Sequence, residues 1–400
     1  MISGEDFVDI AYDPLLLADD PYPAYRRLRA EEPVYRGQTG EGISFWALSR
    51  FADVQAAAVD WESFSSAEGN DLDDTGLLFG PAPAMDCADP PQHTRMRNVL
   101  RKMFSASVIN ERFAPLVHRK VRSAVSELAG QEDVDFAEGL AYSLPAGLIC
   151  ELLGFPRSDH GQLRAWHSRL LAKIPGSMSL PPDAMSAHRE MWQYLTEQLA
   201  DRRKSPRDDL LSVLASAQLG GALSQDEVLA NVMFLFDAGI VSTNSTIASA
   251  LLHMHEFSDQ WQLLRRSPAI SASAVEEFLR FDAPFHWFKR VTTREVKFHD
   301  VSIPAGARVI LIWASANRDE RRWEDSEKLL LDRPVKSHLT FSTGIHHCVG
   351  SLFARLELKV LFEELAARMV DYEITGAVKR RVTPSERTIV SLPARVLWEK

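Results

Sequence analysis

The chain has 400 residues, of which 46% are hydrophobic and 25% charged, a globular composition with enough apolar material for a deep core. Its net charge of −10 disfavours a nucleic-acid partner, which would select a basic surface. The three cysteines, Cys87, Cys150 and Cys348, are too scattered for a disulfide framework and lack the C-x-x-C spacing of a structural zinc site.

The first 23 residues are acidic and interrupted by proline. They contain neither a basic segment followed by an apolar core nor a run of about 18 apolar residues. The sequence therefore predicts neither export nor a membrane anchor at this end. We expect a cytoplasmic monomer without a membrane partner.

The first third of the chain mixes helix and strand. Its pattern predicts a helix over residues 23–30 and strands near 34–35 and 44–48. A Gly-, Asp- and Pro-rich stretch at 66–91 is typical of a long loop. Loops of this length in compact proteins tend to be functional.

From residue 92 to about 264 apolar residues recur three and four apart, which predicts helices with breaks at 154–156, 174–182 and 204–207. Short strands are expected later, at 291–293, 296–298 and 308–312. A helix from 349 to about 369 and further strands complete the chain.

These patterns predict a mostly α fold with a minor β part, in one domain over residues 1–400. Its expected parts are a helix-rich core at about 92–281 and 349–369 and strand-richer parts at about 31–60, 290–315 and 380–398.

The stretch 341–350 reads FSTGIHHCVG, and an amphipathic helix follows its cysteine. Free backbone N–H groups and the positive end of that helix should point at Cys348, a setting that lowers a thiol pKa and favours the thiolate. Gly344 and Gly350 would let the backbone approach a flat cofactor. The residues alone also allow an inert buried thiol, a nucleophile with His346 or His347 as base, or a zinc site with both histidines.

The stretch resembles the haem-binding loop of the cytochrome P-450 family, Phe-x-x-Gly-x-His/Arg-x-Cys-x-Gly, and fills every fixed position. The resemblance extends from DPYPAYRRLRAEEPVY near the start to SLPARVLW near the end, and it is to the soluble bacterial type. It implies haem b between a long oxygen-side helix and the cysteine-loop helix, with the Cys348 thiolate as axial ligand. The haem-binding residues it implies are His93, Arg97, Ala238, Gly239, Arg290, Phe341, Gly344, His346, Cys348 and Gly350.

Two groups of charged residues support the resemblance. Glu277 and Arg280 lie three apart on a predicted helix and could be an ordinary surface pair worth less than about 1 kcal/mol. The resemblance implies instead a buried triad with Arg333 that braces the haem loop. It also implies that His93, Arg97, Arg290 and His346 supply the cationic donors that two buried propionates need.

Segment 93–122 is basic within an acidic protein. Against the single acid Glu111 it carries Arg95, Arg97, Arg101, Lys102, Arg112, Arg119, Lys120 and Arg122. The segment could be a solvated helix face. The resemblance implies a docking face for an acidic ferredoxin, which includes Arg95, Arg101 and Lys102. No Rossmann glycine fingerprint follows a strand, so the electrons need an external source.

The helix expected at 231–255 departs from the family pattern. Ala238 and Gly239 match a small pair where the helix loosens, but Val241 occupies the acid position and Ser242 the threonine position. Valine cannot relay a proton, whereas serine can. Protons could come through Ser242 or Thr243 with ordered water, from a substrate hydroxyl or carboxylate, or the reaction could bypass ordinary hydroxylation.

Asp237 lies one turn before Val241, where the family usually has an apolar residue. It could face the pocket or turn to a local backbone or cationic partner. An unpaired carboxylate in an apolar pocket should have a raised pKa and could carry protons or hold a donor group of the substrate.

The expected function is a haem-thiolate monooxygenase that inserts oxygen from O2 into a small aromatic or secondary-metabolite substrate, with electrons from a ferredoxin. Ser242, Thr243 and Asp237 are the candidate catalytic residues. The expected pocket walls are Leu77, Leu78, Phe79, Phe234, Asp237, Phe285, His286, Trp287 and Ile389. Alternatives are oxidative coupling of aromatic groups, weakly suggested by the Ala-Gly-x-x-Ser-Thr run, and a haem protein that binds a ligand without turnover.

Overall fold

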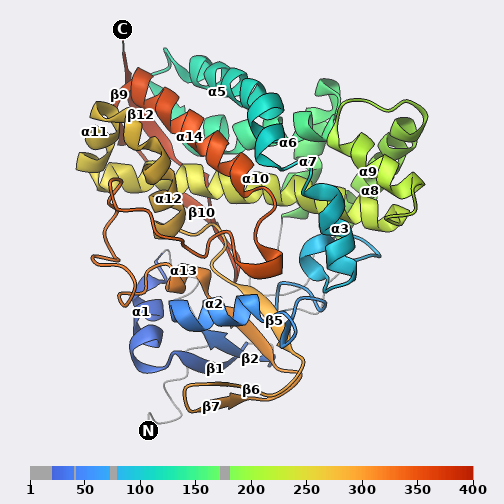
Figure 1. Cartoon of the computed structure of the whole chain (residues 1–400). Helices are drawn as coiled ribbons and strands as arrows, with labels where there is room; N and C mark the ends of the chain where they lie inside the picture. The colour runs from blue at the N-terminus through green and yellow to red at the C-terminus, as the bar shows by residue number, and fades with distance from the viewer. Residues whose placement is uncertain (1–19, 40–41, 73–78, 172–180, 400) are drawn as a thin grey trace.

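A 32-residue helix, α10 (Gln225–Glu256), runs through the middle of the protein (Figure 1). It begins with a capping box, in which the Ser224 hydroxyl accepts from the Glu227 amide at 3.1 Å and the Glu227 carboxylate accepts from the Ser224 amide at 2.8 Å. Most of its residues are buried, as expected for a helix that is apolar on most faces. The computed structural model describes residues 20–39, 42–72, 79–171 and 181–399.

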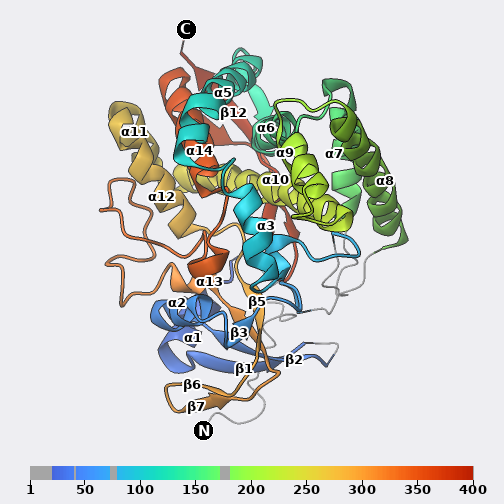
Figure 2. The ribbon, with the colours of Figure 1, turned by 45° about the vertical axis from the view of Figure 1, so that its right-hand side comes forward.

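Most of the other helices surround α10 on the helix-rich side of the protein, and the strands of the larger sheet lie at the opposite end together with α1, α2 and α13 (Figures 1 and 2). In chain order the helices are α1 (Tyr22–Glu31), α2 (Phe51–Val59), α3 (Gln92–Leu100), α4 (Ala106–Val108), α5 (Ala114–Leu128), α6 (Ser143–Leu153), α7 (His160–Leu170), α8 (Pro182–Lys204), α9 (Leu210–Leu219), α10, α11 (Ser258–Arg266), α12 (Ser271–Phe281), α13 (Trp313–Ala316) and α14 (Ser351–Arg368). Short 3₁₀ or π turns are η1 (Met85–Cys87), η2 (Ile109–Phe113), η3 (Ala137–Tyr142) and η6 (Gly344–His346).

Four small sheets complete the fold. Their strands are β1 (Val34–Gln38), β2 (Ser44–Leu48), β3 (Phe64–Ser65), β4 (Asp133–Asp135), β5 (Phe288–Thr292), β6 (Val296–Phe298), β7 (Val301–Ile303), β8 (Arg308–Leu311), β9 (Met369–Ile374), β10 (Lys379–Val382), β11 (Arg387–Ser391) and β12 (Pro393–Trp398). The largest sheet has the order β1-β2-β8-β5-β3, in which only β2 and β8 are parallel. The others are β4-β12-β9 and the pairs β6-β7 and β10-β11.

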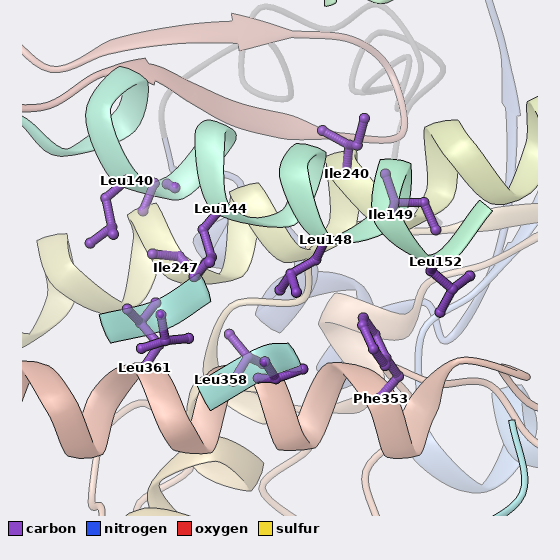
Figure 3. Packing of buried hydrophobic residues seen from close by; sticks show 14 of the residues in the cluster. Leu140, Leu144, Leu148, Ile149, Leu152, Ile240, Ile247, Phe353, Leu358 and Leu361 are labelled. Atoms are coloured by element: carbon purple, nitrogen blue, oxygen red, sulfur yellow. The ribbon is translucent and has the colours of Figure 1, made fainter. Parts of the chain in front are cut away.

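The main hydrophobic core lies between α6, α10 and α14 (Figure 3). Leu144 and Leu148 of α6 point toward Ile247 of α10 and toward Leu358 and Leu361 of α14, and all five are buried. Each such side chain contributes about 1.5–3 kcal/mol relative to an exposed position. This packing sets the separation of α10 and α14, the two helices that the haem should lie between.

The mostly α prediction is confirmed, and most elements lie where their patterns indicate. The predicted helical region from 92 to about 264 had no strand among its breaks, which is wrong at β4, a strand that pairs with Pro393, Ala394 and Arg395 of β12. Such a pairing joins segments about 260 residues apart, so no local pattern reports it. The predicted loop at 66–91 contains the turn η1 in its described part, and residues 73–78 and 172–180 lie outside the described residues.

Within the described residues, α10 is the one helix that is long and apolar enough to cross a membrane. Of its most apolar window, 72% is buried inside the protein. A core helix of a soluble protein meets the same criterion, so the composition of α10 matches its central place in the fold.

Behind the cysteine loop, Glu277 pairs with two arginines. Its carboxylate accepts from Arg280 at 2.7 and 2.8 Å and from Arg333 at 3.1 Å, and the three side chains are at most 10% exposed. The same carboxylate accepts from the amide of Leu330 at 3.0 Å. Arg280 also donates to the carbonyl of Asn317 at 3.0 Å. The triad therefore ties α12 to the chain that leads into the cysteine loop.

Replacing Glu277 with glutamine should lower the free energy of unfolding by about 3–5 kcal/mol, because it strands two buried guanidinium groups. Urea titration followed by circular dichroism measures the change. The matched control is Asp133→Asn, whose partner Arg395 lies 3.2 Å away with both side chains more than 60% exposed. It should lose about 1 kcal/mol or less. Equal losses in the two variants would contradict a buried brace.

Candidate active site

Cys348 lies just before α14, with its side chain open to a large internal cavity. Its amide donates to the carbonyl of Phe341 at 2.8 Å, which closes the loop. Gly350 has open space on the cavity side, since an added Cβ would come no nearer than 4.0 Å to the sulfur. At Gly344 a glycine is needed for a different reason from the expected approach of the backbone to a flat cofactor. Its φ is +68°, and a Cβ there would lie 3.1 Å from the carbonyl oxygen of Ala58 at the end of α2.

Burial raises the pKa of the Cys348 thiol above its ordinary value. The backbone N–H groups of Gly350 and Ser351 and the guanidinium groups of Arg97 and Arg355 oppose this shift without cancelling it. The expectation of a lowered pKa is therefore wrong for the polypeptide alone, because desolvation outweighs the helix terminus. A coordinated metal ion deprotonates a thiol outright, so the thiolate state depends on iron itself.

The two histidines beside the cysteine point in different directions. The His346 ring lies against His93, with 4.5 Å between ring centroids, whereas His347 lies 6.4 Å from the ring of Phe341. Among the described residues no group of three His, Cys, Asp or Glu side chains is placed to hold a metal ion. The geometry therefore offers no support for the zinc alternative.

One end of the cavity gathers His93, Arg97, Arg290 and His346. Both ring nitrogens of His93 and Nε2 of His346 are buried without a hydrogen-bond partner among the described residues. A buried polar group left unpaired costs about 1–3 kcal/mol. Arg97 donates to the carbonyl of His347 at 2.5 Å, which ties α3 to the cysteine loop.

Burial and neighbouring guanidinium groups disfavour positive charge on the two histidines of this cluster. Burial and the neighbouring Arg97 lower the pKa of His93 to about 4. Burial, Arg290, His93 and Arg97 lower the pKa of His346 to about 2, and burial lowers the pKa of Arg290 to about 10. Two carboxylates would relieve this repulsion and accept from the unpaired nitrogens. The residues present therefore fit a haem whose iron meets Cys348 and whose propionates meet this cluster.

The cavity-facing side of α10 carries Ala238, Gly239, Ser242 and Thr243. The Ser242 hydroxyl donates to the Ala238 carbonyl at 2.7 Å. The expected loosening is absent, because α10 is continuous here. A Cβ on Gly239 would lie 3.1 Å from Cδ1 of Ile149, so this glycine also permits close packing of α6. Val241 is buried and does not line the cavity.

Asp237 lines the cavity and also has a partner. Its Oδ1 lies 3.1 Å from Nε2 of His167, and Nδ1 of that histidine lies 3.1 Å from the hydroxyl of Tyr142. The Asp237 side chain is 26% exposed, whereas that of His167 is 1% exposed. Asp237 therefore combines the two alternatives, since it faces the pocket and also has a partner. Sequence reasoning missed His167 and Tyr142, which lie on α7 and η3 and carry no local signal for this contact.

The expected walls are partly wrong. Phe79, Phe234 and Phe285 line the cavity, but His286, Trp287 and Ile389 do not. His286 is buried against the hydroxyl of Tyr25 at 3.0 Å, Trp287 donates to the Pro384 carbonyl at 2.9 Å, and Ile389 belongs to the main core. Leu77 and Leu78 lie outside the described residues. Acidic walls that the sequence did not indicate are Asp71, Asp86, Glu357 and Glu386.

Three comparisons bear on this geometry. The family model for Cytochrome P-450 matches residues 255–368. The chain is 33% identical to Cytochrome P-450 107B1 of Saccharopolyspora erythraea over 410 aligned residues, 99% of each chain, and 36% identical to a vitamin D(3) 25-hydroxylase of Pseudonocardia autotrophica over 87% of this chain and 86% of that one. The solved structure of the tirandamycin C-bound monooxygenase TamI is similar, with a TM-score of 0.86 and 29% identity over 96% of this chain and 99% of TamI. Because identity above 30% extends along nearly the whole chain, this protein belongs to the cytochrome P-450 family, whose members are oxidoreductases that incorporate oxygen at a haem b held by a cysteine thiolate.

Proposed function

We propose that this protein is a cytoplasmic, monomeric monooxygenase that inserts oxygen into a small organic substrate, with electrons from a ferredoxin-type partner. The proposal rests on the groups that line one cavity. Cys348 and the polar face of α10 both line it, and His93, Arg97, Arg290 and His346 can bind two carboxylates there. Haem bound there would supply iron whose thiolate ligand pushes electron density forward and favours O–O cleavage.

We assign the supply of protons on the oxygen side to Ser242. Its hydroxyl donates to the Ala238 carbonyl, and its oxygen can accept from a water or a substrate hydroxyl in the cavity. When the O–H turns from Ala238 toward the cavity, Ser242 passes on its own proton and takes a new one from that water or hydroxyl. Thr243 is 5% exposed and lines the same wall, where it can hold such a water. Val241 has no proton to give. The Ser242 hydroxyl contacts the carbonyl of Ala238, one of the small pair, and so takes the role of proton donor in this proposal.

The Ala-Gly-x-x-Ser-Thr run at 238–243 favours a second candidate function, oxidative coupling of aromatic groups. Such a reaction needs the same protons to cleave O2, and a phenol hydroxyl of the substrate could supply them alongside Ser242. Product analysis with a reductase system separates the possibilities: oxygen inserted, hydrogen lost with a new bond between rings, or no product from a protein that only binds its ligand.

Cys348→Ser and Cys348→His should abolish the red-shifted absorption band of the ferrous carbon-monoxide complex, because neither residue provides a thiolate. The spectrum of reduced, carbon-monoxide-treated protein measures this. Cys150→Ser is the control, since Cys150 is buried in the hydrophobic core away from the loop, and it should keep the band. Persistence of the band in Cys348→Ser would contradict the assignment of Cys348 as the iron ligand.

Ser242→Ala should lower the rate of product formation at least tenfold, since a positioned proton donor contributes typically about 10²–10⁴-fold. Electrons should be diverted to peroxide, while the haem spectrum stays unchanged. Ser242→Thr keeps the hydroxyl and should retain product formation. The measurement is product and peroxide formed per NADH consumed. Unchanged coupling in Ser242→Ala would mean that a substrate group or another residue supplies the proton.

For electron delivery we propose a basic face built on α3 and α5. Arg95 belongs to it only in part, because it makes a bidentate pair with Glu227 at 2.5 and 2.8 Å. Arg101 and Lys102 are exposed and make no ion pair with any described residue. Leu352, four residues beyond Cys348, is 42% exposed and offers an apolar contact on the protein surface near the cysteine.

Charge reversal at Arg101 or Lys102 should slow reduction by a ferredoxin several-fold at low salt, and the wild-type rate should fall as ionic strength rises. Exposed charges are screened within about 10 Å at 0.1 M salt. Arg26→Glu on α1, at the sheet end of the protein, is the matched control (Figure 2). Stopped-flow reduction under carbon monoxide measures the rate. Reduction rates that change neither with salt nor on charge reversal at Arg101 or Lys102 would contradict this docking face.

A further inference from the structure

The cavity that Cys348 and the cationic cluster line also carries carboxylates. Asp237 comes from α10 and Asp86 from η1, two segments about 150 residues apart in the chain. Carboxylates in an otherwise apolar cavity are costly unless something pairs with them. The cationic cluster is already suited to the propionates, so these acids call for another partner.

Buried His167 and half-buried Tyr142 hold the Asp237 carboxylate in place. The Tyr142 hydroxyl and the Asp237 carboxylate flank the His167 ring, each at 3.1 Å. Burial raises the pKa of Tyr142 to about 12, so the phenol keeps its proton. The imidazole bridges the phenol and the carboxylate, and its tautomer sets which atom donates at each contact. In the part of the chain that the structure describes, Oδ2 of Asp237 has no hydrogen-bond partner and remains open to the cavity.

Asp86 lines the same cavity, but it is already provided with partners. Its Oδ2 accepts from Nδ2 of Asn70 at 2.6 Å and from the thiol of Cys87, whereas Oδ1 is buried with no partner among the described residues. Burial raises the pKa of Asp86 to about 6, the hydrogen bond with Cys87 and the positive charge of Arg290 oppose this rise, and the negative charge of Asp237 adds to it. Asp237 is therefore the acid whose oxygen is free to take a new partner in the cavity.

Aromatic rings also line the cavity. Phe79 and Phe234 meet edge to face with 5.8 Å between ring centroids, and Phe285 lies 5.1 Å from Phe288. All four rings line the cavity. Aromatic faces attract cations as well as apolar groups.

We propose that the substrate is an amphiphilic organic cation, an amine on an aromatic or aliphatic body, whose positive group is bound by Oδ2 of Asp237. His167 and Tyr142 are positioning residues that fix the Asp237 carboxylate. The inference rests on the proposed function, because it concerns the same cavity. Asp237 precedes Ser242 by five residues, about 7.5 Å along the helix. The oxidised atom therefore lies several bonds from the charged nitrogen.

A matched pair of probes tests the charge preference of the haem-loaded protein. Benzyltrimethylammonium and neopentylbenzene have the same shape, differ in one positive charge, and cannot coordinate iron through nitrogen. Equilibrium dialysis measures both dissociation constants. The cation should bind at least tenfold more tightly than the neutral probe. Asp237→Asn should remove that advantage and leave neopentylbenzene unaffected. Asp226→Asn, an exposed position in the first turn of the same helix, changes the charge equally and should alter neither constant.

Tyr142→Phe and His167→Phe test the positioning role. Each should lower the ratio of cation to neutral affinity by about two- to fivefold, with the neutral probe bound as before. An equal loss for both probes would show that His167 only packs, and would overturn its role. Equal binding of the two probes to the wild-type protein, or an unchanged ratio in Asp237→Asn, would overturn the proposal as a whole.

The carbon-monoxide spectrum separates this outcome from failure of the proposed function. If the thiolate band is present and the probes do not discriminate by charge, only the substrate class is wrong. If the wild-type protein lacks the band, the proposed function itself fails.

Discussion

The structure depends on holding the Cys348 sulfur in a buried cavity between α10 and α14. Burial raises the pKa of the Cys348 thiol and so disfavours its charged form, and the backbone N–H groups of the loop do not offset this shift. Segments from all parts of the chain support the loop. Arg97 of α3 donates to the His347 carbonyl, the end of α2 approaches Gly344, and the buried triad at Glu277 holds the chain behind the loop. The axial ligand is one residue, but its position is a property of the whole fold.

The helix α10 has two roles on two faces. One face packs against α6 and α14 through residues such as Ile240 and Ile247, and the other presents small and hydroxyl side chains to the cavity (Figure 3). Gly239 serves both, since it lines the cavity and lets Ile149 approach. Core packing fixes the backbone, so a change such as threonine to serine at 242 can alter the chemistry without moving the helix.

The polar residues that line the cavity fall into two groups, one suited to the haem and one suited to the proposed substrate. Among the described residues, nitrogens of His93 and His346 lack hydrogen-bond partners, and so does Oδ2 of Asp237. Unpaired polar groups inside a protein are expensive, and they persist where a ligand completes them. The nitrogens fit the carboxylates of a haem, and the Asp237 oxygen is the basis of the proposed cationic substrate.

The sequence by itself determined the family, the iron ligand and the mostly helical fold, because short motifs with fixed spacing carry them. It also indicated that Asp237 was unusual. Only the tertiary structure decided what Asp237 contacts, since His167 and Tyr142 are 70 and 95 residues away along the chain and helix packing brings them together. The same holds for β4, which forms through pairing with β12, and for His286 and Trp287, which turn into the core instead of the cavity. Local patterns report helices and motifs, whereas contacts between distant segments depend on packing that no local pattern encodes.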